Sequence, residues 1–301
     1  MIVKSLLATA QLAAAIAIAQ PAQAKGPLVL EPNSPWNLDY AEDSCALRRR
    51  FGEGEQSTTL EMRRFAPDNE FQTMVASSAV KMGFGSFKYR LTPDKNWQDP
   101  AGWHHLNFAE EQEGVIFSFP LVQIPRKGLR AADLVKAEEI LESRDFLDRE
   151  ADAADKVTGL ALTGAFRSQL VLDTGSLKKP LLALRTCIDE LRSHWGIDLK
   201  AHETLTRPAV PTNRASIVSM INYPPEMEKK RMPGMVNIRL DIDEKGGITD
   251  CHIQMPLADP EFAKSSCSDL QHELDFEPAL DKEGKPIASY WVTTVDFRMD
   301  W

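Results

Sequence analysis

The chain has 301 residues, of which 43% are hydrophobic and 26% charged, and its formal net charge is −9. This balance is typical of a folded, soluble protein and argues against a largely disordered one. The acidic excess would repel a nucleic-acid backbone or an anionic membrane surface, so we expect neither as a partner.

Residues 1–24 have the features of a secretion signal peptide. Lys4 gives a positive start, an apolar run follows over 5–19, and the stretch 21–24 ends in a small-residue cleavage site. The apolar run is shorter than the roughly 20 residues that a membrane span needs. We therefore expect a cleaved signal and a periplasmic protein; an uncleaved signal that anchors the chain in the inner membrane is the alternative.

Residues 25–200 are expected to form a β-rich domain that ends in a helix. Three β-compatible runs at 45–51, 58–65 and 71–77 are separated by turn residues, which predicts an antiparallel meander. Further strands are predicted at 87–91, 115–124, 157–166 and 168–173, with a long loop at 92–107 and one or two helices within 131–154.

The strongest helix signal of this half follows residue 175. Ser176 can cap the helix, and apolar residues recur at helical spacing from Leu177 to Leu191, with Cys187 on or near the same face. Residues 201–215 contain two prolines and show no apolar periodicity, so we expect a linker there.

The last part of the chain has the clearest pattern. Apolar and polar residues alternate over 236–243, a Gly-Gly turn follows at 246–247, and 248–254 can return as the second strand of a hairpin. Asp259 is a plausible N-cap with Pro260 at the first helical position. A final strand is predicted over 287–299.

Four short motifs accompany these elements: Tyr-Pro-Pro-Glu-Met at 223–227, Phe-Glu-Pro-Ala at 276–279, Gly-Lys-Pro at 284–286 and Val-Asp-Phe at 295–297. The motifs and the order of the elements resemble the C-terminal domain of TonB, the periplasmic energy transducer of Gram-negative bacteria. The resemblance implies that 216–301 form a small ββαβ domain with a helix packed on an antiparallel sheet. The fold class expected for the whole chain is therefore α+β.

The resemblance also implies a function in protein interaction. In the TonB family an extended segment of an outer-membrane transporter, the TonB box, adds to the sheet at an edge strand. Carried over to this sequence, that edge is Val292, Thr293, Thr294, Val295, Asp296 and Phe297. The partner would be such a transporter or another envelope protein. Alternatively, the strand is an ordinary terminal strand that pairs within a homodimer or packs against the first domain.

The chain also departs from the family pattern. A TonB transducer keeps an uncleaved membrane helix and has a long proline-rich spacer, whereas the linker expected here has only Pro208 and Pro211. The resemblance therefore supports binding more than energy transduction. A membrane-anchored transducer is the alternative if the signal is uncleaved.

Four cysteines lie after the expected signal, at Cys45, Cys187, Cys251 and Cys267. An even number in an exported chain predicts two disulfides, with three connectivities to choose from. The domain layout favours pairing within domains, Cys45 with Cys187 and Cys251 with Cys267. A zinc site is disfavoured because no Cys-x-x-Cys pair is present.

One word matches an enzyme family. Asp173-Thr174-Gly175-Ser176 resembles the Asp-Thr-Gly-Ser motif of aspartic proteases, where two such aspartates share a proton. Only one copy is present and a helix follows it directly, so a strand end with a glycine turn is the preferred interpretation. An envelope hydrolase that uses Asp173 in a dimer is the alternative function.

Histidines supply the other candidates for a functional site. His104 and His105 are adjacent, so on a strand they would point to opposite faces. Asp250, His252 and His272 could lie near one another, although a solvated surface cluster is preferred. We therefore expect no metal, no cofactor and no enzymatic activity.

Overall fold

The structure is a computed structural model that describes residues 26–83, 85–100, 102–107, 112–123, 141, 143–212, 221–256 and 259–298. The expected signal at 1–24, the first part of the helices expected within 131–154, and the ends of the expected linker and final strand lie outside the described residues. The chain is α+β, as predicted, and has two separate hydrophobic cores. We call the part built around the N-terminal core the first body and the part built around the C-terminal core the second body.

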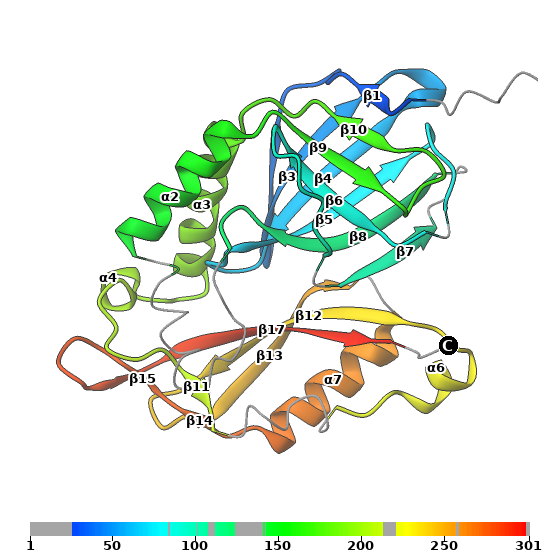
Figure 1. The fold of residues 1–301 in the computed structure, drawn as a ribbon. Coiled ribbons are helices and arrows are strands. Elements are labelled where there is room, and N and C mark those ends of the chain that lie inside the picture. The colour runs from blue at the N-terminus through cyan, green and yellow to red at the C-terminus, as the bar shows by residue number, and fades with distance from the viewer. Residues whose placement is uncertain are drawn as a thin grey trace, which may run out of the picture.

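A six-stranded antiparallel sheet dominates the first body (Figure 1). Its strands in spatial order are β2 (Asn37–Ala41), β3 (Ser44–Phe51), β4 (Thr58–Arg64), β5 (Glu70–Ser77), β8 (Glu113–Pro120) and β7 (Trp103–Asn107). The predicted meander at 45–77 is thus β3, β4 and β5. Strand β7 falls where the sequence predicted a loop; it pairs with β8 from Trp103↔Phe117 to Asn107↔Glu113.

A second sheet of four strands shares the same core. Its order is β1 (Leu28–Leu30), β10 (Leu170–Leu172), β9 (Gly159–Thr163) and β6 (Lys88–Thr92). The pair β1 and β10 is parallel and the other pairs are antiparallel. Buried aromatic side chains of both sheets meet in the core, for example Tyr89 and Phe119 with ring centroids 5.2 Å apart.

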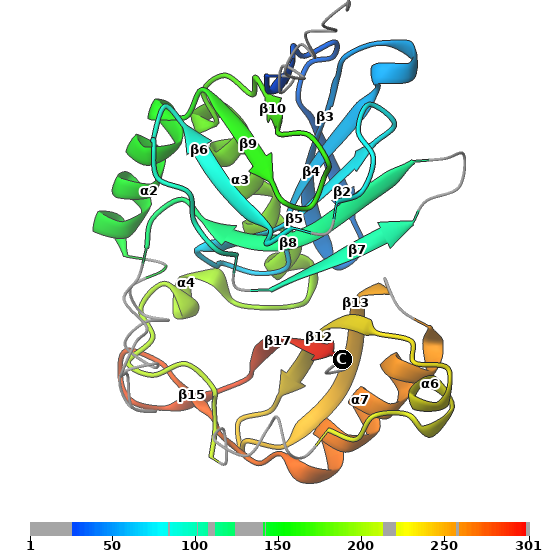
Figure 2. The ribbon, with the colours of Figure 1, turned by 45° about the vertical axis from the view of Figure 1, so that its right-hand side comes forward.

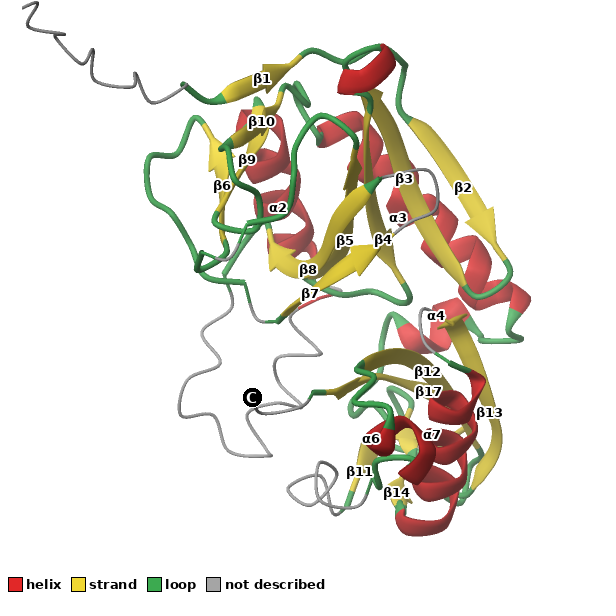
Figure 3. Cartoon of the chain, turned by 90° about the vertical axis from the view of Figure 1, so that its right-hand side faces the viewer, coloured by secondary structure: helices red, strands yellow, loops and turns green. Residues whose placement is uncertain are grey.

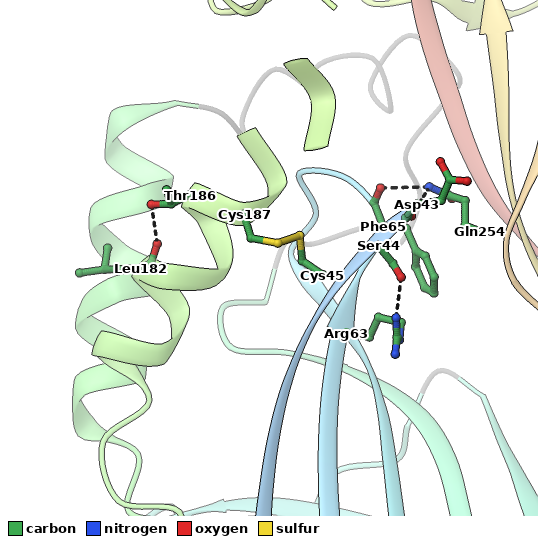
Figure 4. Close-up of a disulfide and its surroundings, with 9 residues drawn as sticks. All are labelled: Asp43, Ser44, Cys45, Arg63, Phe65, Leu182, Thr186, Cys187 and Gln254. Atoms are coloured by element: carbon green, nitrogen blue, oxygen red, sulfur yellow. Dashed lines mark hydrogen bonds between the residues drawn. A yellow bond between two sulfur atoms is a disulfide. The ribbon is translucent and has the colours of Figure 1, made fainter. Parts of the chain in front are cut away.

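Two helices cover one side of the first body. They are α2 (Arg144–Lys156) and α3 (Lys178–His194), and a short helix α4 (Leu199–His202) follows them. The expected cap at Ser176 is displaced by one residue: the N-cap position is Leu177, while the Ser176 hydroxyl accepts a hydrogen bond from the Lys178 amide at 3.3 Å. The Cys45–Cys187 disulfide ties α3 to β3 (Figure 4).

The second body has the predicted ββαβ order. Its three-stranded sheet has the order β13 (Ile248–Pro256), β12 (Gly234–Ile242) and β17 (Ser289–Phe297), and helix α7 (Pro260–Glu273) follows β13 in the chain. Asp259 caps α7, since its carboxylate accepts from the Glu261 amide at 3.1 Å. The Cys251–Cys267 disulfide joins β13 to α7.

Smaller elements complete this body. They are a helix α6 (Pro225–Lys229), the strand pair β11 (Val210–Pro211) with β14 (Phe276–Glu277), and the pair β15 (Ala279–Leu280) with β16 (Pro286–Ile287). The expected linker at 201–215 is therefore not extended in its described part. Ala209 is only 2% exposed in the second core, and the Thr212 amide donates to Asp275 O at 2.9 Å.

The sheet of the second body lies between α7 and the first body (Figures 1 and 2). Figure 3 shows the same layering from the side, with β12 and β17 next to α4 and the lower end of the first body. One sheet face is thus covered by the helix and the other by the first body.

Candidate functional site

The six residues predicted to bind a peptide, Val292–Phe297, all lie in β17 at the edge of the second sheet. Strand β17 pairs antiparallel with β12 from Gly234↔Phe297 to Ile242↔Ser289. Among the described residues no strand pairs with the other side of β17. Strand β17 is therefore paired with β12 at one edge, and no described strand pairs with its other edge.

Alternate side chains of β17 hold the strand on the helix side of the sheet. The Trp291 ring lies 5.5 Å from the Phe276 ring, and the Phe297 ring lies 4.6 Å from that of Phe262 on α7. Trp291, Val295 and Phe297 are all buried. Burial of aromatic side chains stabilises the strand strongly. The packing of these side chains in the second core therefore fixes the position of β17 in the sheet.

The opposite face of the sheet carries polar residues that contact the first body. The Asn237 side chain on β12 exchanges hydrogen bonds with Gln72 on β5 at 3.1 and 3.2 Å. The Thr294 hydroxyl donates to the same Asn237 oxygen at 2.8 Å. Asn237 is only 1% exposed, so its amide is satisfied entirely within the protein.

Arg239 is the main charged contact between the two bodies. Its guanidinium donates to Asp43 at 2.9 Å and to Asp241 at 3.1 Å, and it lies 4.1 Å above the Trp195 ring. The Gln254 amide also donates across the interface, to the carbonyl oxygens of Asp43 and Phe65 (Figure 4). A buried cation needs such partners, because desolvation without them would be costly.

The carboxyl end of β17 is held by a histidine of the first body. His104 Nε2 lies 2.7 Å from Asp296 Oδ1, and Arg298 donates to the other oxygen of the same carboxylate at 2.6 Å. Burial alone would raise the pKa of Asp296, but the hydrogen bonds from His104 and Arg298 outweigh it, so the pKa lies below its ordinary value. Asp296 is therefore a carboxylate at neutral pH.

The amino end of β17 meets α4. His202 Nε2 lies 3.0 Å from the Ser289 hydroxyl, and its Nδ1 lies 3.0 Å from the carbonyl of Asp198. Burial lowers the pKa of His202, so its ring is neutral at neutral pH. The Tyr290 ring packs edge-on against Trp195 with centroids 5.4 Å apart.

A cavity of about 430 Å³ opens along this first half of β17. Its walls come from Ser289–Val292 on the strand, from Ala66–Asp68 between β4 and β5, and from His202, Leu205 and Ala209 after α3. A volume of this size is within the range of sites that bind small molecules or peptide segments. The edge of the second body and the surface of the first body thus line one cavity.

The other sequence-predicted residues lie apart from this edge or serve local structure. Asp173 follows β10 and its carboxylate accepts the Gly175 amide at 3.3 Å, in a turn where Gly175 has φ +60°. This is the geometry of a strand end that turns into a helix. His105 is largely exposed, and partial desolvation lowers the pKa of its ring, against the opposing charge of Glu113.

The structure brings only part of the last candidate cluster together. His252 Nε2 lies 2.8 Å from Asp241 and 3.7 Å from Asp250, while His272 is exposed on α7. Over the residues that the structure describes, no group of three or more His, Cys, Asp or Glu side chains could hold a metal ion.

Sequence reasoning missed the side of the interface that the first body supplies, namely Gln72, Asp43 and Phe65. The sequence gives only an indirect indication of these contacts. Asn237 and Arg239 occupy the polar positions of the alternating pattern in β12, and that pattern does not identify the groups that face them. His104 was a candidate, but its partner 192 residues away could not be deduced from the sequence.

Comparison with known proteins bears on the second body. Within the described part of the chain, no helix has both the length and the apolar character to span a membrane. No curated protein matches the chain. Residues 219–299, which include β12, β13, α7 and β17, match the family model described as Gram-negative bacterial TonB protein C-terminal.

Proposed function

We propose that this is a periplasmic interaction protein that binds an extended polypeptide by strand addition to the free edge of β17. The partner is the extended segment of an outer-membrane transporter or of another envelope protein. One observation carries the proposal: in the described structure β17 pairs with β12 on one side and with no strand on the other. The family match at 219–299 supports it, because that family acts in protein interaction.

The composition of β17 is unusual for an unprotected edge. Edge strands are commonly protected by proline, lysine, a bulge or shortness. β17 has nine residues, Ser-Tyr-Trp-Val-Thr-Thr-Val-Asp-Phe, with no proline or lysine and one charged residue. Such a strand tends to pair with another chain, which favours an edge with a partner over a solvated one.

The edge is also the accessible route to this sheet. Helix α7 covers one face, and the other contacts the first body through Asn237, Arg239 and Asp296. A partner that approached either face would have to displace packed side chains. A partner that adds sideways uses main-chain groups and leaves both packed faces intact.

Paired proline substitutions test the proposal. Successive residues of a strand direct their N–H groups to opposite edges, so of Thr293→Pro and Thr294→Pro one removes a backbone bond to β12 and the other leaves the backbone bonds to β12 in place. Thr294→Pro also removes the hydroxyl bond to Asn237, a loss that Thr294→Val reproduces alone. The variant that retains its stability should lose peptide binding, while its neighbour should lose stability. Binding would be measured by fluorescence anisotropy of a labelled synthetic peptide taken from the extended segment of a transporter.

Amide hydrogen exchange of β17 gives the second readout. Added peptide should slow exchange at alternate amides between residues 289 and 297, because only every second N–H faces the free edge. If those amides are already protected in the monomer, and no peptide changes them, the proposal is wrong. Protection that rises with protein concentration alone would identify a second copy of the chain as the occupant.

A further inference from the structure

The edge of β17 that faces away from β12 forms one side of a groove, and the first body forms the other side. The cavity of about 430 Å³ is lined by four consecutive residues of the strand, Ser289–Val292. Consecutive side chains of a strand point to opposite faces of the sheet, and β12 occupies one edge of β17. A cavity that all four residues line therefore runs along the other edge.

The contacts of α4 agree with this placement. His202 Nε2 lies 3.0 Å from the Ser289 hydroxyl, and the His202 ring stacks on the Tyr290 ring with centroids 6.2 Å apart. Because Ser289 and Tyr290 are neighbours, their side chains leave the strand on opposite faces, and a residue that contacts both lies beside the strand. The chain that follows α4 continues the same wall with Leu205, Pro208 and Ala209.

A smaller cavity of about 140 Å³ extends the groove toward the carboxyl end of β17. It is lined by Val292–Thr294 and reaches into the interface at Asn237. It shares Ala66 and Asp68 of the first body with the larger cavity, as well as one residue of the strand. The two cavities therefore adjoin and together follow β17 over residues 289–294.

The first-body side of the groove has a fixed shape. It is the segment Ala66–Asp68 between β4 and β5, in which Ala66 is buried and Pro67 restricts the backbone. The Asp68 carboxylate accepts hydrogen bonds from the amides of Asn69 at 2.6 Å and Glu70 at 3.2 Å, which holds the turn.

The two bodies are joined near both ends of the strand. The Tyr290 ring packs against Trp195 at one end, and the Asp296 carboxylate contacts His104 at the other. These contacts hold the first-body wall at a set position relative to β17. A preformed groove needs little ordering when a ligand binds, so more of the contact energy contributes to affinity.

The lining of the larger cavity favours an uncharged, apolar occupant. Its uncharged walls include Pro67, Leu205, Pro208, Trp291 and Val292. Among the described residues that line it, the charged ones are both acidic, Asp68 and Glu203, because burial keeps the ring of His202 neutral. Arg192 does not line the cavity and has an acidic neighbour, Asp189, at 3.7 Å. A carboxylate in this cavity would therefore lie close to like charges.

We propose that the first body selects the polypeptide that pairs with β17, because the cavity beside Ser289–Val292 receives one large apolar side chain of the added strand. In strand addition the main-chain bonds give affinity, and pockets for alternate side chains give specificity. The inference rests on the proposed function, since the side chain enters the cavity only when its strand lies on β17.

Three peptides test the selection on the full chain. Each is an acetylated and amidated heptapeptide of threonine whose central residue is leucine, alanine or aspartate, and its binding is measured by competition with a labelled peptide. We expect the leucine peptide to bind at least about tenfold more tightly than the alanine peptide, since the larger side chain loses more apolar surface to the cavity. The aspartate peptide should bind more weakly than the alanine peptide.

Variants assign these differences to the cavity. Leu205→Trp narrows it and should reduce the advantage of leucine over alanine, while Glu203→Gln should bring the aspartate peptide closer to the alanine peptide. Leu182→Trp is the matched control: it makes the same change at an exposed position of α3 that lines neither cavity of the groove. If Leu205→Trp fails to fold, the three peptides on the unmodified chain still decide.

The outcomes separate this inference from strand addition itself. A tenfold advantage of leucine that Leu205→Trp reduces and Leu182→Trp retains supports the selecting cavity. If the leucine and alanine peptides bind alike and protect the same β17 amides, or if Leu205→Trp leaves the advantage unchanged, strand addition stands and the selecting cavity is overturned. If none of the three peptides binds, the selecting cavity is also overturned, and the transporter peptide alone decides strand addition.

Discussion

His104 Nε2 lies 2.7 Å from Asp296 Oδ1 and joins an edge strand of the first body, β7, to the edge strand of the second, β17. Both side chains are mostly buried, with 15% and 21% of their surfaces exposed. The contact places a titratable group of the first body directly on the strand proposed to bind a partner. The contact therefore links the stability of the interface between the two bodies to the position of β17.

Replacing His104 should weaken the contact between the two bodies. Because a hydrogen bond to a charged group contributes about 1.5 kcal/mol or more, we expect His104→Ala to lower the free energy of unfolding by about that amount, measured by urea denaturation. His105→Ala is the control, since the adjacent side chain is exposed and should cost about 0.5 kcal/mol or less. Equal losses for the two variants would contradict the interface role.

His202 should make the protein less stable in mild acid. Burial lowers the pKa of His202 in the folded chain below the ordinary 6.5, so the unfolded chain binds the proton more tightly. The contribution of the neutral His202 ring to the free energy of unfolding is complete above about pH 6.5. It is lost as the pH falls from there through the pKa of His202 in the folded chain. Among the groups that surround the ring, Asp198 opposes this shift and Arg192 reinforces it.

The measurement is the urea midpoint between pH 5 and 8 for the unmodified chain and for His202→Gln. The substitution removes the titrating ring, so the variant should show a smaller loss of stability toward pH 5. Parallel pH profiles for the two proteins would show that His202 does not titrate across this range.

The two disulfides should differ in their contribution to stability. Cys251 and Cys267 are 16 residues apart, whereas Cys45 and Cys187 are 142 residues apart. Chain entropy predicts a loss of about 3 kcal/mol when the short loop is opened by serine substitution at both positions, and of more than about 4 kcal/mol for the long loop. Thermal unfolding of the two double variants tests this order, and a larger effect of the short loop would contradict it.

Gly246 should resist substitution more than Gly284, a turn glycine with a similar φ. It has φ +83°, and a Cβ at this position would collide with the carbonyl oxygen of Phe276. We expect Gly246→Ala to cost about 2–3 kcal/mol, since strain in the left-handed region adds to the collision. Gly284→Ala is matched in φ, at +77°, but opens onto free space, and it should cost only about 1 kcal/mol.

Local signals predicted most of the second body correctly. The alternation over 236–243, the cap at Asp259 and the proline at 260 depend only on neighbours in sequence, and the structure places β12 and α7 there. The pairing of cysteines within each body also followed from the layout, and the structure has those two bonds.

The interface could not be predicted in the same way. Alternation identifies two faces of β12 but not what covers the polar one, and Asn237 and Arg239 prove to be 1% and 4% exposed. Strand β7 was missed because Trp103-His104-His105 lacks the usual alternation and depends on pairing with β8. The segment around Ala209 was predicted to be a linker because it contains prolines and lacks apolar periodicity. In the structure Val210 and Pro211 pair with Glu277 and Phe276, which are 67 and 65 residues further along the chain.

Neither disulfide crosses from one body to the other, so each body is cross-linked internally and no disulfide joins the two. The interface between them combines polar contacts, such as Arg239 with Asp43 and Gln72 with Asn237, with the packing of Tyr290 on Trp195. When the halves separate, water can replace the hydrogen-bond partners of these polar groups, whereas it cannot replace the apolar packing inside each core. If a polypeptide docks at β17 as proposed, we therefore expect a mechanical pull on it to separate the two halves before it unfolds either one.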